Sequence, residues 1–102
     1  MEIFRSKDAD QDLREIYIFT RRTRGERQAE RYFARLNRCL EFVAEQPMSA
    51  QLRSEFTPHD RVHMCGSHML IYTVVEDRIV FVVRILHSRM NIAGRLPEEF
   101  LD

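Results

Sequence analysis

Apolar side chains recur every three or four residues in the first half of the chain, which is the period of an α-helix. Ser6 precedes the first run and is a good N-cap residue, while Gly25 interrupts the run after a cluster of arginines. The spacing therefore predicts a helix over residues 7–23. The side of this helix that faces the core is formed by Ala9, Leu13, Ile16, Tyr17 and Thr20.

A second helical pattern follows Gly25 and is closed by Pro47, which cannot continue a helix. A short connection at one glycine places two helices side by side in opposite directions. We therefore expect a helical hairpin whose apolar stripes both face one sheet. The stripe of the second helix consists of Ala29, Phe33, Leu36, Leu40 and Val43, widened by Tyr32, Cys39 and Ala44.

The second half of the chain changes to strand-like patterns separated by short turns. Residues 66–67 and 77–78 suit tight turns, and residues 3–4 form a short apolar segment at the N-terminus. The last two strands are apolar on both faces, which places them at the centre of the sheet. The pattern predicts an α+β fold, in which an N-terminal strand and a two-helix hairpin pack on a small, mainly antiparallel sheet. The later strands are expected over Arg61–Cys65, His68–Glu76 and Ile79–His87.

Composition agrees with a globular protein built around one core. The chain has 102 residues, of which 44% are hydrophobic and 31% charged, so we expect a single domain over residues 1–102. It contains neither a secretory signal nor an apolar run near the roughly 20 residues that a membrane span needs, which predicts a cytoplasmic protein with no membrane partner. Cys39 and Cys65 should then be reduced, because disulfides are rare in that compartment.

Charge is balanced overall but unevenly distributed. Residues 21–38 contain seven arginines and only two glutamates, although the formal net charge of the whole chain is zero. This arginine cluster is either a solvated helix face or a binding surface for an acidic protein, and both are favoured over direct DNA binding because the chain as a whole is not basic. The cluster includes an arginine ridge, defined here as Arg27, Arg31, Arg35 and Arg38.

The segment from Arg84 to Asn91 is the most distinctive motif in the sequence. Further positions match the same pattern, namely Ser6, Ala9, Asp12, Leu13 and Ile16 in the first helix, Ala29, Tyr32 and Leu36 in the second, and Arg61, His68, Ile71 and Tyr72 in the strands. With the order of elements, these residues give a chain that resembles the ParE family of bacterial type II toxins along nearly its whole length. Asn91 departs from the family, which usually has an acidic residue there.

The resemblance implies a function and a set of partners. It implies a toxin that is neutralised by a ParD-like antitoxin and that poisons DNA gyrase by contact, without a cofactor or metal. Operator DNA would be bound only through the antitoxin. We expect the arginine ridge to bind the antitoxin, and a surface around His87, Arg89 and Arg95 to bind the target.

The enzymatic alternative is a ribosome-dependent messenger ribonuclease like RelE, which shares the fold. Such an enzyme needs an acid, a base and cations near one phosphate, and the candidates are Arg61, Tyr72, Arg84 and His87. With a two-residue turn at 77–78, Tyr72 and His87 share one face of the sheet and Arg84 lies on the other. With a three-residue turn, Tyr72 and Arg84 share a face and His87 points away. Without a bulge, neither register gathers the set.

Two further groups of residues have plain and functional interpretations. His63, Cys65 and His68 have a spacing that a zinc site could use, but a closed site needs a fourth ligand, and histidines on a solvated hairpin explain the same spacing. Arg84 lies in the most apolar strand, where an unpaired charge is costly. It is therefore either functional or paired with a carboxylate such as Glu55.

Overall fold

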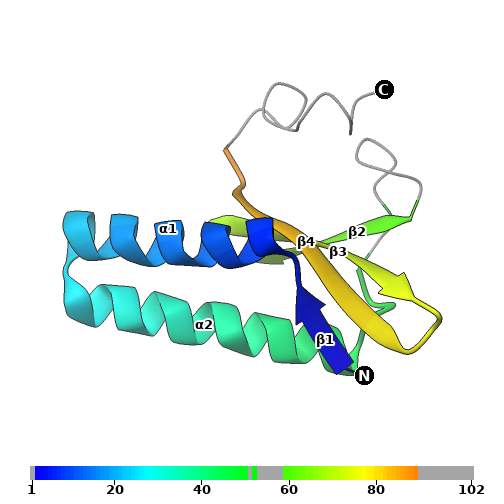
Figure 1. Ribbon diagram of the computed structural model, residues 1–102. Helices are drawn as coiled ribbons and strands as arrows, with labels where there is room; N and C mark the ends of the chain where they lie inside the picture. The colour runs from blue at the N-terminus through cyan, green and yellow to red at the C-terminus, as the bar shows by residue number, and fades with distance from the viewer. Residues whose placement is uncertain (1, 51, 53–58, 90–102) are drawn as a thin grey trace.

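The computed structural model describes residues 2–50, 52 and 59–89. One mixed sheet has the strand order β1-β4-β3-β2, in which β1 runs parallel to β4 and the other pairs are antiparallel. The two helices run side by side in opposite directions (Figure 1). The elements are β1 (Glu2–Arg5), α1 (Lys7–Arg24), α2 (Glu26–Glu45), β2 (Asp60–Cys65), β3 (His68–Val75) and β4 (Ile79–His87). The predicted fold class and the central position of the last two strands are confirmed.

The helix boundaries follow from local chemistry at Ser6 and Gly25. The Ser6 hydroxyl oxygen accepts the Ala9 N–H at 2.9 Å and so caps the first turn of α1. Gly25 has a φ of +92°, a conformation that favours glycine, and it ends α1 while its carbonyl accepts the Ala29 N–H of α2. One residue therefore reverses the chain. Neither helix in the described part of the chain is long and apolar enough to cross a membrane.

The core lies between the helical hairpin and one face of the sheet. Leu36 and Val43 of α2 are at most 1% exposed, and they share a hydrophobic cluster with Leu70 and Tyr72 of β3. The predicted helix phases are thus confirmed. The cluster is completed by Ala9, Leu13, Leu40, Cys65, Val80, Val82 and Ile85, with Ile16, Tyr32, Phe33 and Cys39 packed against it.

The β3–β4 hairpin combines two registers. Its turn is three residues long, since Val75 pairs with Ile79, but the register shifts between Ile71 and Tyr72. Tyr72 pairs with Val82 and Ile71 with Arg84, so Val83 is the extra residue of a bulge in β4. Neither register expected from the sequence extends along the whole hairpin. Beyond the bulge the strands continue to the pair His68 and His87.

Side chains from α1 and from its N-cap, Ser6, form hydrogen bonds with the part of β4 that has no β1 residue beside it. Strand β1 pairs only with Ile79–Val82, and beyond this point the Ser6 hydroxyl donates to the Val83 carbonyl at 2.7 Å. The Asp12 carboxylate then accepts the Ile85 N–H at 2.9 Å and binds the Arg84 guanidinium at 2.8 and 3.0 Å. This bidentate bond raises the pKa of Arg84. The partner of Arg84 is therefore Asp12 of α1; Glu55, which the sequence suggested, lies outside the described residues.

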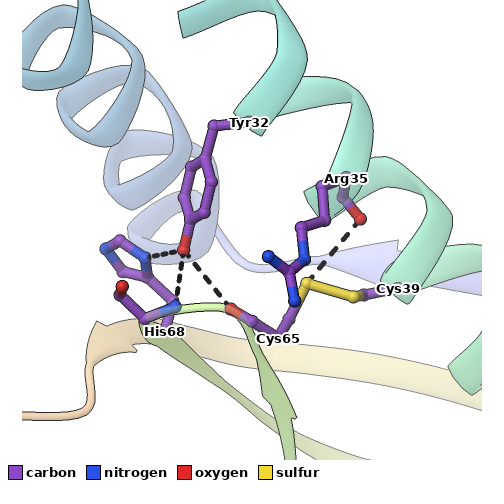
Figure 2. The surroundings of a disulfide bond; sticks show 6 residues. Tyr32, Arg35, Cys39, Cys65 and His68 are labelled. Carbon is purple, nitrogen blue, oxygen red and sulfur yellow. Dashed lines mark hydrogen bonds between the residues drawn. A yellow bond between two sulfur atoms is a disulfide. The ribbon is translucent and has the colours of Figure 1, made fainter. Parts of the chain in front are cut away.

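Cys39 and Cys65 form a disulfide between α2 and β2 (Figure 2). The expectation that both cysteines are reduced is wrong in this structure. The packing of α2 against β2 brings residues 26 positions apart to a Cα–Cα distance of 6.2 Å, which their unlike sequence contexts did not indicate. The bond closes a loop that, in the chain-entropy description, stabilises the fold by about 3 to 4 kcal/mol.

The contact between Asp12 and β4 predicts a large effect of removing the carboxylate. Asp12→Ala should lower the free energy of unfolding by on the order of 3 kcal/mol, because it leaves the Arg84 guanidinium and the Ile85 N–H without their partner. Chemical denaturation measures this. Asp10→Ala is the matched control: Asp10 binds Arg5 at 2.6 Å on the surface, where an ion pair contributes about 0 to 1 kcal/mol. Equal losses in both variants would contradict the role given to Asp12.

Candidate functional site

The residues proposed for a ribonuclease are divided between two parts of the molecule. The Tyr72 hydroxyl is fully buried and donates to the Pro47 carbonyl at 2.7 Å, while Arg61 donates to the Ala50 carbonyl at 2.5 Å. Burial raises the pKa of Tyr72. His87 lies opposite His68, four positions along β3 from Tyr72, which corresponds to about 13 Å along the strand.

The second pair, Arg84 and His87, lines a cavity of about 690 Å³ between the helical hairpin and the ends of β3 and β4. We call it the hairpin cavity. The Arg84 guanidinium is bound by the Asp12 carboxylate, so the charge of Arg84 is already compensated. Tyr72 and Arg61 do not line this cavity. The structure thus brings Arg84 and His87 to one site and leaves the other two ribonuclease candidates in structural hydrogen bonds elsewhere.

Tyr32 organises the wall of the hairpin cavity. Its hydroxyl accepts the Ser67 N–H at 3.0 Å and lies 2.5 Å from Nδ1 of His68 and 3.3 Å from the Cys65 carbonyl oxygen (Figure 2). Gly66 has a φ of +58°, and a Cβ there would lie 2.9 Å from the Tyr32 ring. The glycine therefore permits both the turn and the close approach of the tyrosine.

His68 and His87 form a pair at the end of the sheet. Their rings meet edge to face with centroids 5.2 Å apart, and Nδ1 of His87 accepts the Arg89 N–H at 3.0 Å. Burial, followed by the charge of His87, lowers the pKa of His68 to about 4, and Asp12 opposes this change. His68 is therefore neutral at pH 7 and can donate or accept a hydrogen bond without carrying charge.

The arginine ridge lies along the exposed side of α2. All four members, Arg27, Arg31, Arg35 and Arg38, are exposed. Arg35 also lines the hairpin cavity, so the two surfaces are continuous at this residue. Of the residues proposed for target binding, His87 lines the cavity, Arg89 is exposed just beyond it, and Arg95 lies outside the described residues.

The three residues considered as zinc ligands have other partners. Cys65 is held in the disulfide and the His68 ring contacts Tyr32. The His63 ring packs on Phe42 with centroids 5.3 Å apart. Within residues 2–50, 52 and 59–89, no group of three histidine, cysteine or acidic side chains is arranged to hold a metal ion.

Comparison with known proteins identifies the family. Residues 3–92 match the family described as "ParE toxin of type II toxin-antitoxin system, parDE". This chain belongs to the ParE toxin family. It is 34% identical over 91 residues to Toxin ParE1 of Mycobacterium tuberculosis, an alignment that covers 89% of this chain and 93% of that protein. Toxin ParE of Escherichia coli is 33% identical, with 89% and 88% covered, and Toxin ParE1 of Caulobacter vibrioides is 31% identical.

A solved structure supports the fold of this ParE family member. The structure titled "Chromosomal ParDE TA system from P. aeruginosa" superimposes with a TM-score of 0.74 and covers 85% of this chain and 95% of that chain. The sequence identity is 16%, so the likeness concerns the fold alone.

Sequence analysis missed how two residues work in the site. Tyr32 appears in the sequence as a residue that widens an apolar stripe and as a member of the family pattern, and Asp12 only as a member of that pattern. A polar side chain on the buried side of a helix is the signal that could have identified both, because such a group needs a hydrogen-bond partner in the core.

The depressed pKa of His68 predicts a pH dependence of stability. The pKa is about 4 in the fold, against 6.5 for an unperturbed histidine, so between these values the unfolded chain binds more protons than the folded one. The free energy of unfolding should therefore fall as pH decreases from about 6.5 to about 4, and His68→Gln should flatten this part of the profile. Denaturation across a pH series measures the effect. His59→Gln, which changes an exposed histidine, serves as the control and should leave the slope in place.

Proposed function

We propose that this ParE family member inhibits DNA gyrase by contact and is neutralised by a ParD-like antitoxin. The observation that carries the proposal is the family match over residues 3–92 together with relatives named ParE at 31 to 34% identity. The division of the ribonuclease candidates supports inhibition by contact over messenger cleavage. Tyr72 and Arg61 bind backbone carbonyls, whereas a cleavage site needs its acid, base and cations around one phosphate.

The surface around the hairpin cavity suits a protein target. His87 and Arg89 are joined by a hydrogen bond, in which the Arg89 N–H donates to Nδ1 of His87. With Arg95 they form the proposed target-binding surface. The position of His87 depends on the bulge in β4 and on its contact with His68, so the fold holds this part of the surface in place.

The arginine ridge suits the antitoxin. Four exposed arginines on one helix attract an acidic segment, and electrostatic attraction of this kind mainly accelerates association. The fold-level neighbour is titled as a ParDE system, which supports an antitoxin as the partner. Operator DNA would then be contacted through the antitoxin, since the chain carries no net positive charge.

Charge reversal on the ridge tests the antitoxin interface. Arg31→Glu and Arg35→Glu together should slow association with a cognate ParD-like antitoxin by about tenfold at low salt, and should weaken the dependence of the rate on salt. Stopped-flow or surface-based kinetics across a salt series measures both. Arg78→Glu in the β3–β4 turn is the control, and it is compared with Arg31→Glu alone, which changes the charge by the same amount. A rate that responds equally to both changes would remove the ridge from the interface.

Two activity assays run side by side test the gyrase proposal. The purified chain should inhibit supercoiling by gyrase and leave ribosome-bound messenger intact. Arg89→Ala should weaken inhibition by about tenfold or more, because it removes an exposed charge of the proposed target-binding surface without touching the core.

His87→Ala decides between the two candidate functions, provided that circular dichroism shows a folded variant. Messenger cleavage by the unmodified chain that disappears in His87→Ala, with supercoiling unaffected, would replace the gyrase proposal with the ribonuclease. Loss of gyrase inhibition without any cleavage would support the proposal.

A further inference from the structure

The disulfide and Tyr32 attach the same turn to α2 (Figure 2). Cys39 follows Tyr32 by seven residues, about two helical turns, so both project from one side of α2. Cys39 is bonded to Cys65, and the Tyr32 hydroxyl contacts the carbonyl of Cys65, the N–H of Ser67 and Nδ1 of His68. The chain from Cys65 to His68 is thus held at two points, one covalent and one hydrogen-bonded.

The two cysteines differ in their exposure. Cys65 is 2% exposed and belongs to the core cluster, whereas Cys39 is only half-buried. Arg38 is its neighbour in the chain and Arg35 lies one helical turn before it, and both are exposed. Positive charge on the same helix, close in sequence to the more exposed cysteine, favours the approach of an anionic thiolate. An attack would therefore occur at Sγ of Cys39.

We propose that Cys39–Cys65 is a site of reversible thiol–disulfide exchange that controls the order of the turn carrying His68. A thiolate of glutathione or of a dithiol protein attacks Sγ of Cys39, the bond to Cys65 breaks, and the Cys65 thiolate leaves and takes up a proton. A second thiolate then attacks the mixed disulfide, releases Cys39 and forms the disulfide of the reductant. Two thiols are oxidised as one cystine is reduced.

The reason to expect exchange rests on the proposed function. Gyrase acts inside the cell, where thiols keep cysteines reduced and most cystines are transient or redox-sensing. A cystine in a protein that acts there must tolerate cycling between both states.

Reduction should act on the hairpin cavity through the turn. Once the bond opens, the turn at Gly66 is held against this part of α2 by the hydrogen bonds of one hydroxyl. Local opening then frees His68 from Tyr32 and from the His87 ring, which lies in the proposed target-binding surface. The oxidised chain should therefore present His87 in one position, and the reduced chain in several.

Hydrogen exchange of the full chain tests this inference. Oxidised protein and protein reduced with a dithiol are compared by mass spectrometry, with peptides from α1 as an internal reference. Reduction should accelerate amide exchange in residues 65–68 at least tenfold more than in α1, and lower the Tm by on the order of 10 °C. Cys39→Ala should match the reduced protein in both buffers, whereas Ser49→Ala, at a residue that lies beyond the end of α2 and contacts the Gln46 carbonyl, should respond like the unmodified chain.

The results that would overturn the proposal are separate from those that test the gyrase target. Two results would overturn the redox proposal. One is two free thiols after treatment with oxidised glutathione, and the other is an equal rate of amide hydrogen exchange in residues 65–68 in both redox states. Gyrase inhibition is measured with both forms, and the oxidised form should be several-fold stronger. If neither form inhibits gyrase, only the gyrase proposal is contradicted. The redox site is tested by amide hydrogen exchange, which is measured without gyrase.

Discussion

The Asp12 carboxylate is the contact on which the arrangement of the helices and the sheet depends. Strand β4 has β1 beside it for only half its length, and an uncovered strand edge in a core leaves backbone groups without partners. Asp12 satisfies the Ile85 N–H and the Arg84 guanidinium together, and Ser6 satisfies the carbonyl of Val83. These bonds fix how α1 lies along β4. Since Gly25 joins α1 directly to α2, they also constrain α2.

The same contact explains the bulge in β4. The extra residue, Val83, allows the register to shift, so that Ile85 still packs in the core while Arg84 reaches α1. The shift also sets His87 opposite His68. A structural requirement at the strand edge thus determines which histidines meet in the hairpin cavity.

The opposite side of the hairpin cavity depends on α2. Tyr32 and the disulfide hold the turn between β2 and β3, and Gly66 leaves the space that the Tyr32 ring occupies. The cavity therefore lies between two attachments, Asp12 from α1 and Tyr32 from α2. Arg61 and Tyr72 belong to neither attachment. They donate hydrogen bonds to the carbonyls of Ala50 and Pro47, beyond the end of α2. This separation keeps Arg61 and Tyr72 apart from Arg84 and His87, which supports the proposal of inhibition by contact.

The sequence alone determined the local structure of this protein, and tertiary structure decided the site. Periodicity, caps and turns act over a few residues, so they predicted helices α1 and α2, the N-cap at Ser6, the reversal at Gly25 and the central strands. The family likeness was visible in a separate feature, the motif from Arg84 to Asn91. The Asp12–Arg84 pair, the Tyr32–His68 contact and the disulfide join residues 72, 36 and 26 positions apart. Such contacts exist only after the helices pack on the sheet, and the bulge that aligns His68 with His87 depends on that packing. The positions of these side chains therefore follow from long-range geometry, which no local pattern in the chain encodes.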